Sequence, residues 1–157
     1  MLDTRFSQNC RRREFVRWIG ELEMTHALTL NTDRVLSAKN LSAIFSLFCK
    51  KLDVMAHGRN LRGVPTEDRL LAIGFPENLR TNAHLHVAAD LTFLQAPART
   101  RPAGLYGLIH DAWLQSTNNT GSIYVGLHPD RGWFEYMTKH FTRTGGQFFL
   151  SVDYHPH

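Results

Sequence analysis

Hydrophobic positions recur along the chain with two different periods, which predict two kinds of element. Apolar residues spaced three or four apart are typical of one face of an α-helix. Helices are predicted on this basis at residues 10–22, 38–56, 102–115 and 131–142. Short apolar or alternating runs bounded by turn residues are typical of strands. They predict strands at residues 24–30, 70–75, 83–91, 122–127 and 147–154.

The order of these segments predicts the fold class. After a helical start it reads β-α-β-β-α-β, followed by one more helix and a fifth strand. This order predicts an α+β, ferredoxin-like split βαβ arrangement, with an antiparallel sheet of about five strands and helices packed on one face. No repeat or linker divides the chain, so we expect one domain over residues 1–157, with a basic segment at 1–22 and a core at about 24–154. Many unrelated proteins share this fold, and it does not choose a function by itself.

Composition indicates where the protein acts and what class of molecule it binds, but it does not indicate an activity. The chain is 43% hydrophobic and 20% charged, carries a net charge of +4 and contains nine histidines. A basic protein attracts polyanions such as nucleic acid. No apolar run approaches the roughly 18 residues of a membrane span, and no secretory leader is recognisable. The two cysteines lack metal-site spacing. We therefore expect a cytoplasmic protein with no membrane partner.

The motif His84-Leu85-His86 lies in a predicted strand. Side chains two apart point to the same face of a strand, so both imidazoles can bind one divalent cation while Leu85 faces the core. The other interpretation is a pair of half-buried strand histidines. Glu77 faces His84 if the intervening turn is tight, and it could then supply a third ligand rather than lie in solvent. Glu67 and Asp68 are the alternative carboxylates.

A second candidate group is Tyr136-Met137-Thr138-Lys139 on a predicted helix. Residues three apart are neighbours on a helix surface, so Lys139 would lie beside Tyr136. A tyrosine can act as a covalent nucleophile when a nearby cation favours its phenolate, and a lysine can also hold a phosphate. The alternative is an amphipathic helix in which Tyr136 is a packing residue.

Three motifs in chain order resemble those of the HUH endonucleases, and in particular their rolling-circle replication initiators (Rep type). The motifs are Leu28-Thr29-Leu30-Asn31, His84-Leu85-His86 and Tyr136-Met137-Thr138-Lys139, within a stretch of roughly residues 24–142. The resemblance implies a single-stranded DNA endonuclease that nicks an origin or terminal hairpin, remains joined to the 5′ phosphate through a tyrosine, and leaves a 3′ hydroxyl that can reverse the step.

Carried onto this chain, the resemblance implies a role for each motif residue. Tyr136 would be the nucleophile and Lys139 its electrostatic partner, while His84 and His86, with Glu77, would bind Mg or Mn. It also implies replication of a plasmid or phage-like element. The chain shows no helicase domain, so we expect a separate helicase to unwind the DNA.

Two basic loops are candidates for phosphate contacts, and several other functions compete with nicking. Arg59 and Arg62 lie in one loop and Arg99 and Arg101 in another, although any of them could simply be solvated. A single-tyrosine transposase or a relaxase would share the chemistry. A nucleic-acid-binding module without catalysis would use the same sheet, and a metal-dependent hydrolase would use water in place of Tyr136.

Overall fold

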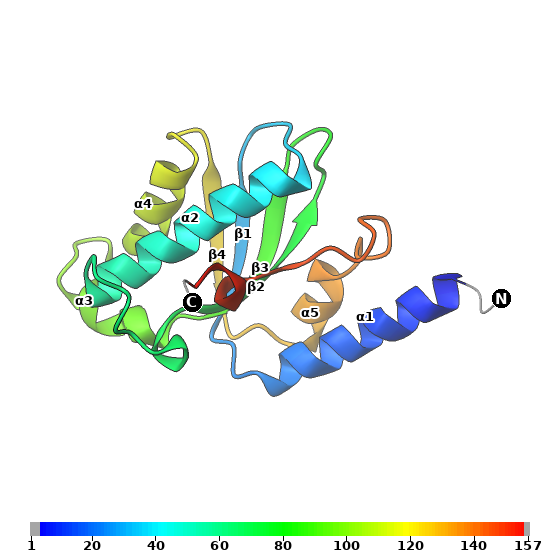
Figure 1. Ribbon diagram of the computed structural model, residues 1–157, viewed down its shortest axis with the longest axis horizontal. Helices are drawn as coiled ribbons and strands as arrows, with labels where there is room; N and C mark the ends of the chain where they lie inside the picture. The colour runs from blue at the N-terminus through cyan, green and yellow to red at the C-terminus, as the bar shows by residue number, and fades with distance from the viewer. Residues whose placement is uncertain (1–3, 156–157) are drawn as a thin grey trace.

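A five-stranded antiparallel sheet organises the protein, which is described here as a computed structural model (Figure 1). The structure describes residues 4–155, so residues 1–3 and 156–157 of the expected domain lie outside the described residues. The strands are β1 (His26–Asn31), β2 (Leu71–Glu77), β3 (His84–Asp90), β4 (Ser122–Leu127) and β5 (Phe149–Leu150). Their spatial order is β4-β1-β3-β2-β5, and every neighbouring pair is antiparallel. The first four strands have the predicted ferredoxin-like arrangement, and β5 extends it beside β2.

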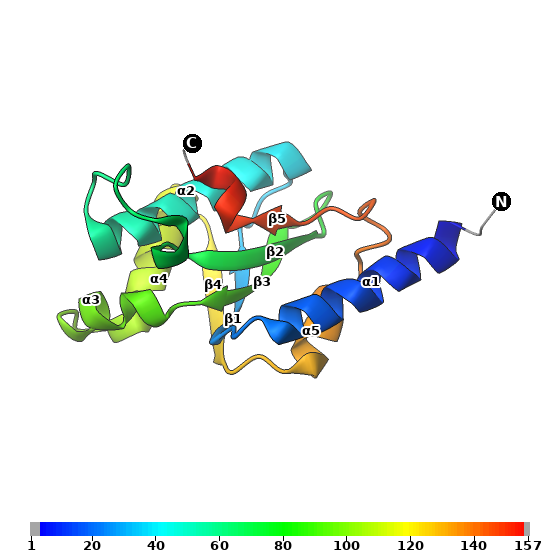
Figure 2. The same cartoon turned by 60° about the horizontal axis from the view of Figure 1, so that its bottom comes forward.

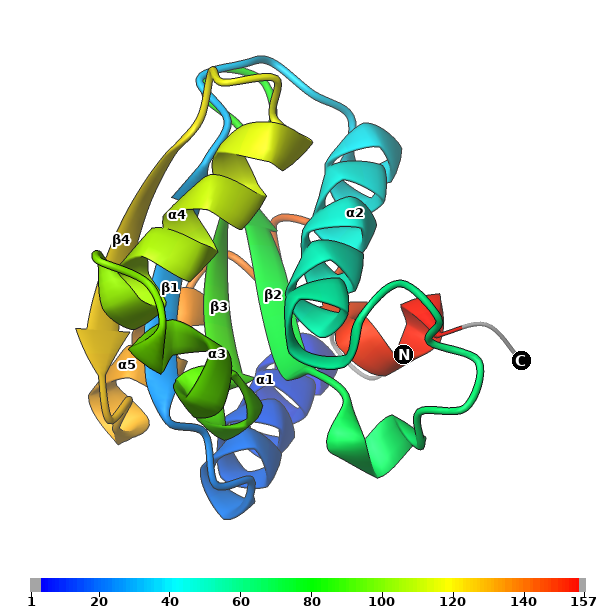
Figure 3. The ribbon, with the colours of Figure 1, turned by 90° about the vertical axis from the view of Figure 1, so that its left-hand side faces the viewer.

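Helices cover both faces of this sheet. The α-helices are α1 (Thr4–Glu21), α2 (Ala38–His57), α3 (Gln95–Arg99), α4 (Gly104–Ser116) and α5 (Arg131–Met137). Short 3₁₀ helices are η1 (Thr66–Asp68), η2 (Thr92–Leu94) and η3 (Ser151–Tyr154). Helices α2 and α4 lie together over one face, whereas α1 and α5 lie together over the other (Figures 2 and 3). The expectation that the helices share one face is therefore wrong for α1 and α5.

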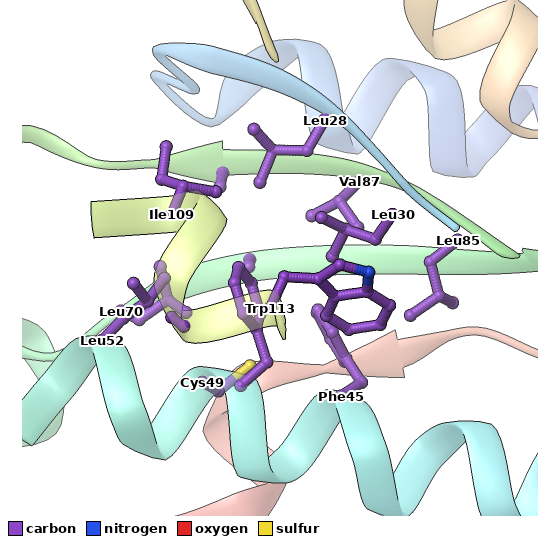
Figure 4. Packing of buried hydrophobic residues seen from close by; sticks show 14 of the residues in the cluster. Leu28, Leu30, Phe45, Cys49, Leu52, Leu70, Leu85, Val87, Ile109 and Trp113 are labelled. Carbon is purple, nitrogen blue, oxygen red and sulfur yellow. The ribbon is translucent and has the colours of Figure 1, made fainter. Parts of the chain in front are cut away.

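The larger core lies between the sheet and the α2–α4 layer (Figure 4). Trp113 of α4 is fully buried there against Phe48, with ring centroids 5.5 Å apart. Its indole Nε1 donates a 2.7 Å hydrogen bond to the Asn31 carbonyl, so the ring is both packed and satisfied. Leu28, Leu85 and the other buried strand residues on this face contribute about 1.5–3 kcal/mol each through removal of apolar surface from water.

A smaller core on the opposite face fixes α1 and α5. Ile19 of α1 and Phe134 of α5 pack against Ile73 and Phe75 of β2. The apolar side of the N-terminal helix therefore has a partner, which the sequence pattern alone did not identify. This second layer matters for function because it places α5 over the face of β3 that carries the histidines.

Several element boundaries agree with the sequence predictions. Helix α1 begins at Thr4, earlier than the predicted residue 10, and two other elements end early for identifiable reasons. Strand β4 has the expected bounds, and Ser37 caps α2 by accepting a hydrogen bond from the Asn40 N–H. Helix α5 ends at Met137 and turns follow, so the helix predicted to residue 142 is too long. Strand β5 has only two residues because the Ser151 hydroxyl bonds the Leu70 carbonyl and the Ala72 N–H, which replaces the strand ladder.

None of the helices within residues 4–155 is both long enough and apolar enough to cross a membrane.

Replacement of Trp113 by Ala tests the larger core. We expect it to lower the free energy of unfolding by about 3–5 kcal/mol, because it leaves a cavity and removes a buried hydrogen bond. Tyr106→Ala, on the exposed side of the same helix, should change it by less than about 0.5 kcal/mol. Urea denaturation of the three proteins measures both values, and equal midpoints for the two variants would contradict this account of the core.

Candidate functional site

Strand alternation divides β3 between the core and a candidate site. Leu85 and Val87 point into the larger core, whereas His84 and His86 point to the face that carries α5. Glu77 pairs directly with His84 across the β2–β3 hairpin, as the sequence predicts. The turn between them is tight, since Asn78 adopts a positive φ of 53° and its carbonyl accepts from the N–H groups of Thr81 and Asn82.

The Glu77 carboxylate lies between the two imidazoles. Its Oε2 atom is 2.6 Å from Nε2 of His86 and 3.4 Å from Nε2 of His84. One ligand atom from each of the three residues lies within 4.8 Å of the others. Glu77 and His86 are buried, and His84 is half-buried. Two imidazoles and a carboxylate are an ordinary donor set for a divalent ion, so this cluster could hold a metal.

The outer nitrogens of the histidines fix their orientation. His84 Nδ1 lies 3.0 Å from the Asn82 carbonyl, which can only accept a hydrogen bond. Nδ1 therefore carries the proton, and a neutral His84 presents the lone pair of Nε2 to the Glu77 carboxylate. A cation or a second proton is needed between these two atoms to prevent repulsion. His86 Nδ1 lies 3.2 Å from the Thr29 hydroxyl, which can donate or accept, so this contact orients the second ring without fixing its tautomer. At 2.6 Å, Nε2 of a neutral His86 donates its proton to the Glu77 carboxylate, and a metal bound at Nε2 would take the place of that proton.

Burial and charge set the protonation states of the cluster. Burial lowers the pKa of His86 to about 4, although the Glu77 carboxylate acts to raise it. Burial opposes ionisation of Glu77, but His86, Lys139 and His84 together outweigh it and lower the pKa of that carboxyl. At neutral pH, His86 is thus neutral and Glu77 is ionised. These are the forms in which imidazole and carboxylate bind metals.

Tyr136 lies against this cluster, although more than forty residues separate it from His86 in sequence. Its ring centroid is 4.8 Å from that of His86, and 46% of the residue remains exposed. Lys139 Nζ is 3.9 Å from the centre of the Tyr136 ring and 3.3 Å from Glu77 Oε1. Burial opposes the charge on Lys139, but Tyr136 and Glu77 outweigh it and raise the lysine pKa. The predicted proximity of Tyr136 and Lys139 is confirmed, but only Tyr136 lies in α5, and Lys139 lies in the turn that follows the helix.

The position of α5 depends on contacts at both of its ends. Asp130 caps its first turn by accepting a hydrogen bond from the Trp133 N–H. Near its last turn, the Arg12 guanidinium donates to the Glu135 carbonyl at 2.7 Å and to the Thr138 hydroxyl at 3.2 Å. A cation at the C-terminal end of a helix is favoured by the helix dipole. One arginine of the basic N-terminal segment thus helps to orient the helix that carries Tyr136.

Two site residues were missed or only partly foreseen from the sequence. His140 Nε2 lies 3.1 Å from Glu77 Oε1, so a third histidine contacts the carboxylate. Its position next to Lys139 in the same turn was the available signal. Thr29 was noted as part of a motif, and the structure shows why it lies beside the site. It pairs with His86 across strands β1 and β3.

The four arginines expected to contact DNA lie away from this cluster. Glu77 and His84 pair at one end of the β2–β3 ladder, and Leu71 pairs with Asp90 at the other. Arg59 and Arg62 are in the loop that leads to the Leu71 end, and Arg99 and Arg101 follow the Asp90 end. The structure thus does not bring them to the Tyr136 site. Glu67 and Asp68, in η1 at the same far end, do not replace Glu77.

Comparisons with protein-family models, with curated proteins and with solved structures each find no match to this chain.

The first test of the site is metal binding. Glu77→Gln keeps the shape of the side chain but removes its charge, so we expect Mn²⁺ affinity to fall by about 10- to 100-fold or more. Glu67→Gln, which changes a carboxylate at the far end of the sheet, should leave the affinity unchanged. Isothermal titration calorimetry of the three proteins measures it, and equal affinity in wild type and Glu77→Gln would exclude this carboxylate as a ligand.

The second test is the pH dependence of stability without metal. The folded pKa of His86 is about 4, against an ordinary value of 6.5, so the unfolded chain binds the proton more readily between these values. The free energy of unfolding should therefore fall as the pH drops from about 6.5 to about 4, by up to about 3 kcal/mol from this group. Loss of the Glu77 charge at the lower end of this range acts in the same direction.

Urea denaturation with a chelator present, at several pH values, measures this slope. His86→Asn should reduce it, whereas His110→Gln, a change at a partly exposed histidine of α4, should leave it as in wild type. His26 and His155 also have lowered pKa values and contribute a slope common to all three proteins. An unchanged slope in His86→Asn would show that the His86 proton does not control stability.

Proposed function

We propose that the protein is a metal-dependent endonuclease that nicks and rejoins single-stranded DNA through Tyr136. The observation that carries this proposal is the contact between Tyr136 and His86, whose ring centroids are 4.8 Å apart. A nucleophile, a cation and a metal-ligand cluster from distant parts of the sequence converge at one place. Convergence on one phosphate is what a phosphoryl-transfer site requires.

The exposure of Tyr136 supports a chemical role over a packing role. The side chains of α5 that fill the second core are Phe134 and Met137, which are 6% and 3% exposed. Tyr136 lies on a different side of the helix and is 46% exposed. Among the aromatic rings of the described residues, it contacts those of His86 and Trp133. A substrate phosphate could thus reach its hydroxyl.

Each residue would have a defined role in the cleavage step. The Tyr136 phenol oxygen attacks the phosphorus and forms a bond to it, so that Tyr136 becomes joined to the 5′ phosphate. At the same time, the bond from the phosphorus to the 3′ oxygen of the preceding nucleotide breaks. The phenol proton leaves to solvent, and the 3′ oxygen takes a proton as it departs. Lys139 holds a positive charge beside the phenol and stabilises the negative charge that develops on the phenol oxygen as its proton leaves. Rejoining is the reverse attack by the 3′ hydroxyl.

The metal ligands would be His84, His86 and Glu77. A bound divalent ion supplies Lewis-acid polarisation of the phosphate. We propose Mn or Mg, as the resemblance implies. The hard carboxylate suits both ions, and the two imidazoles favour Mn over Mg. Thr29 and Asn82 hold the rings so that both Nε2 atoms face the same point.

The open part of the sheet beside this cluster suits a single strand of nucleic acid. Tyr124 of β4 pairs with Thr29, which in turn pairs with His86, so the three side chains form a row on one face. Tyr124 is 62% exposed. An exposed aromatic ring provides a surface on which a base can stack. A nucleic-acid-binding module without catalysis would use the same row, and the test below separates the two.

Among enzymes of this chemistry, we propose an initiator of rolling-circle replication for a plasmid or phage-like element. The support is the resemblance of its three motifs to Rep-type HUH endonucleases. Such an enzyme would act in the cytoplasm on an origin strand or hairpin, with a separate helicase. A transposase or relaxase would form the same tyrosine adduct, and transfer of cleaved strands between hairpin ends would identify a transposase.

The test is adduct formation on labelled single-stranded DNA with Mn²⁺. We expect wild type to give a covalent protein–DNA band on a denaturing gel when a pool of random sequences and hairpins is supplied. Tyr136→Phe should abolish the band and keep DNA binding, and Lys139→Met should slow its formation by about 10²- to 10³-fold. Tyr106→Phe, which alters an exposed tyrosine of α4, is the matched control and should behave as wild type.

Two outcomes would contradict the proposal. Cleavage that persists in Tyr136→Phe would identify a hydrolase that uses water. Tight binding of the pool with no adduct from any sequence would favour the binding module.

A further inference from the structure

A cavity lies on the opposite face of the sheet from Tyr136. It has a volume of about 480 Å³ and lies between α2, the loop at residues 59–62 and the C-terminal turn. Tyr154 at this turn packs on Phe45 of α2, which places the turn on the α2 side of the sheet. The metal-ligand cluster faces α5 on the other side. The two sites therefore do not share a surface.

One wall of this cavity contains a buried histidine with no hydrogen-bond partner. The side chain of His155 is 7% exposed, and neither ring nitrogen has a partner among the described residues. The carboxylate nearest to it among the described residues is that of Asp53, whose Oδ2 is 4.0 Å from Nε2 and thus beyond hydrogen-bond distance. Asp53 is already satisfied, because it accepts from Arg69 Nε at 2.9 Å and from the Leu70 N–H at 2.8 Å. An imidazole N–H buried without an acceptor is unfavourable, so the ring is suited to a ligand that accepts a hydrogen bond.

The charged side chains around the cavity indicate the sign of the charge on that ligand. Asp53 and Arg69 form a buried ion pair, so their charges cancel locally. The remaining charged side chains of the lining are Lys50, Arg59 and Arg62, and none of them has an ion pair within residues 4–155. The lining therefore carries a net positive charge, and His155 adds a neutral hydrogen-bond donor.

We propose that this cavity is a phosphate-binding site, separate from the nicking site and independent of whether nicking occurs. Phosphate oxygens accept hydrogen bonds from imidazole and from the planar guanidinium group of arginine, which can contact two oxygens at once. His155 supplies the buried donor, and Arg59, Arg62 and Lys50 supply the charge. The volume lies within the range of small-ligand pockets, so a nucleotide-sized molecule fits as well as a bare phosphate.

This assignment changes the role of one arginine pair. Arg59 and Arg62 were expected to contact DNA phosphates, and they line a cavity at the end of the sheet away from Tyr136. A phosphate bound there belongs either to a free nucleotide or to a part of a nucleic acid far from the scissile bond. Both sources present the same oxygens to His155.

Calorimetric titration of the metal-free protein with inorganic phosphate, deoxyadenosine monophosphate and an oligothymidylate without terminal phosphate tests the proposal. We expect at least one of the three to bind, with an affinity at least about tenfold lower in His155→Phe and in Arg62→Ala, the loss of one charged hydrogen bond. Arg99→Ala removes a positive charge outside the cavity and should leave the affinity unchanged. Preference for the mononucleotide identifies a nucleotide site, and preference for the oligonucleotide identifies a remote nucleic-acid contact.

The ring resonances of His155 provide a second readout that does not depend on the stability of the variants. In wild-type protein, ¹⁵N-edited NMR should show these resonances shifting as the bound phosphate compound saturates. Absence of binding by all three compounds would overturn the proposal. So would equal binding by wild type, His155→Phe and Arg62→Ala, or saturation with no change at the His155 ring.

Discussion

The buried carboxylate of Glu77 is the interaction on which the rest of the candidate site depends. Removing a carboxylate from water costs several kcal/mol unless cations or hydrogen-bond donors replace the solvent. Here His84 and His86 approach one oxygen, and Lys139 and His140 approach the other. The first pair comes from β3 and the second from the turn after α5. One charge thus connects a strand hairpin to a helix that is remote in sequence.

The sheet makes this arrangement possible because one of its faces packs in the larger core and the other carries the candidate metal ligands. Leu85, between the two histidines, is fully buried on the α2–α4 side, so the register of β3 is fixed by the larger core. A slip of one residue would bury both imidazoles among apolar side chains and place Leu85 among the polar groups around Glu77. The orientation of the candidate metal ligands is therefore a consequence of core packing. The smaller core fixes α5 in the same indirect way, through Phe134 and Met137.

Features set by local rules could be predicted from the sequence, and features set by distant contacts could not. The pairing of Glu77 with His84 follows from strand period and a tight turn, both of which are local. The contact of His140 with Glu77 depends on where α5 docks, and that depends on α1 and Arg12. The early end of α5 has a similar cause, because Thr138 bonds back to the Phe134 carbonyl while Arg12 binds the next one. Arg59 and Arg62 lie far from the site because of the way the strands are connected. The residue types in their loop do not reveal at which end of the sheet the loop lies.

The division of the two Glu77 oxygens has a chemical consequence for the proposed reaction. Oε2 is directed at the imidazoles and Oε1 at Lys139 and His140, so a cation bound through Oε2 does not displace the lysine. Lys139 in turn lies over the Tyr136 ring at 3.9 Å from its centre. Glu77 would then be both a ligand and the group that positions the lysine beside the nucleophile. A carboxylate shared in this way couples metal binding to the environment of the phenol, because a shift of Glu77 toward a cation also shifts the charge beside Tyr136.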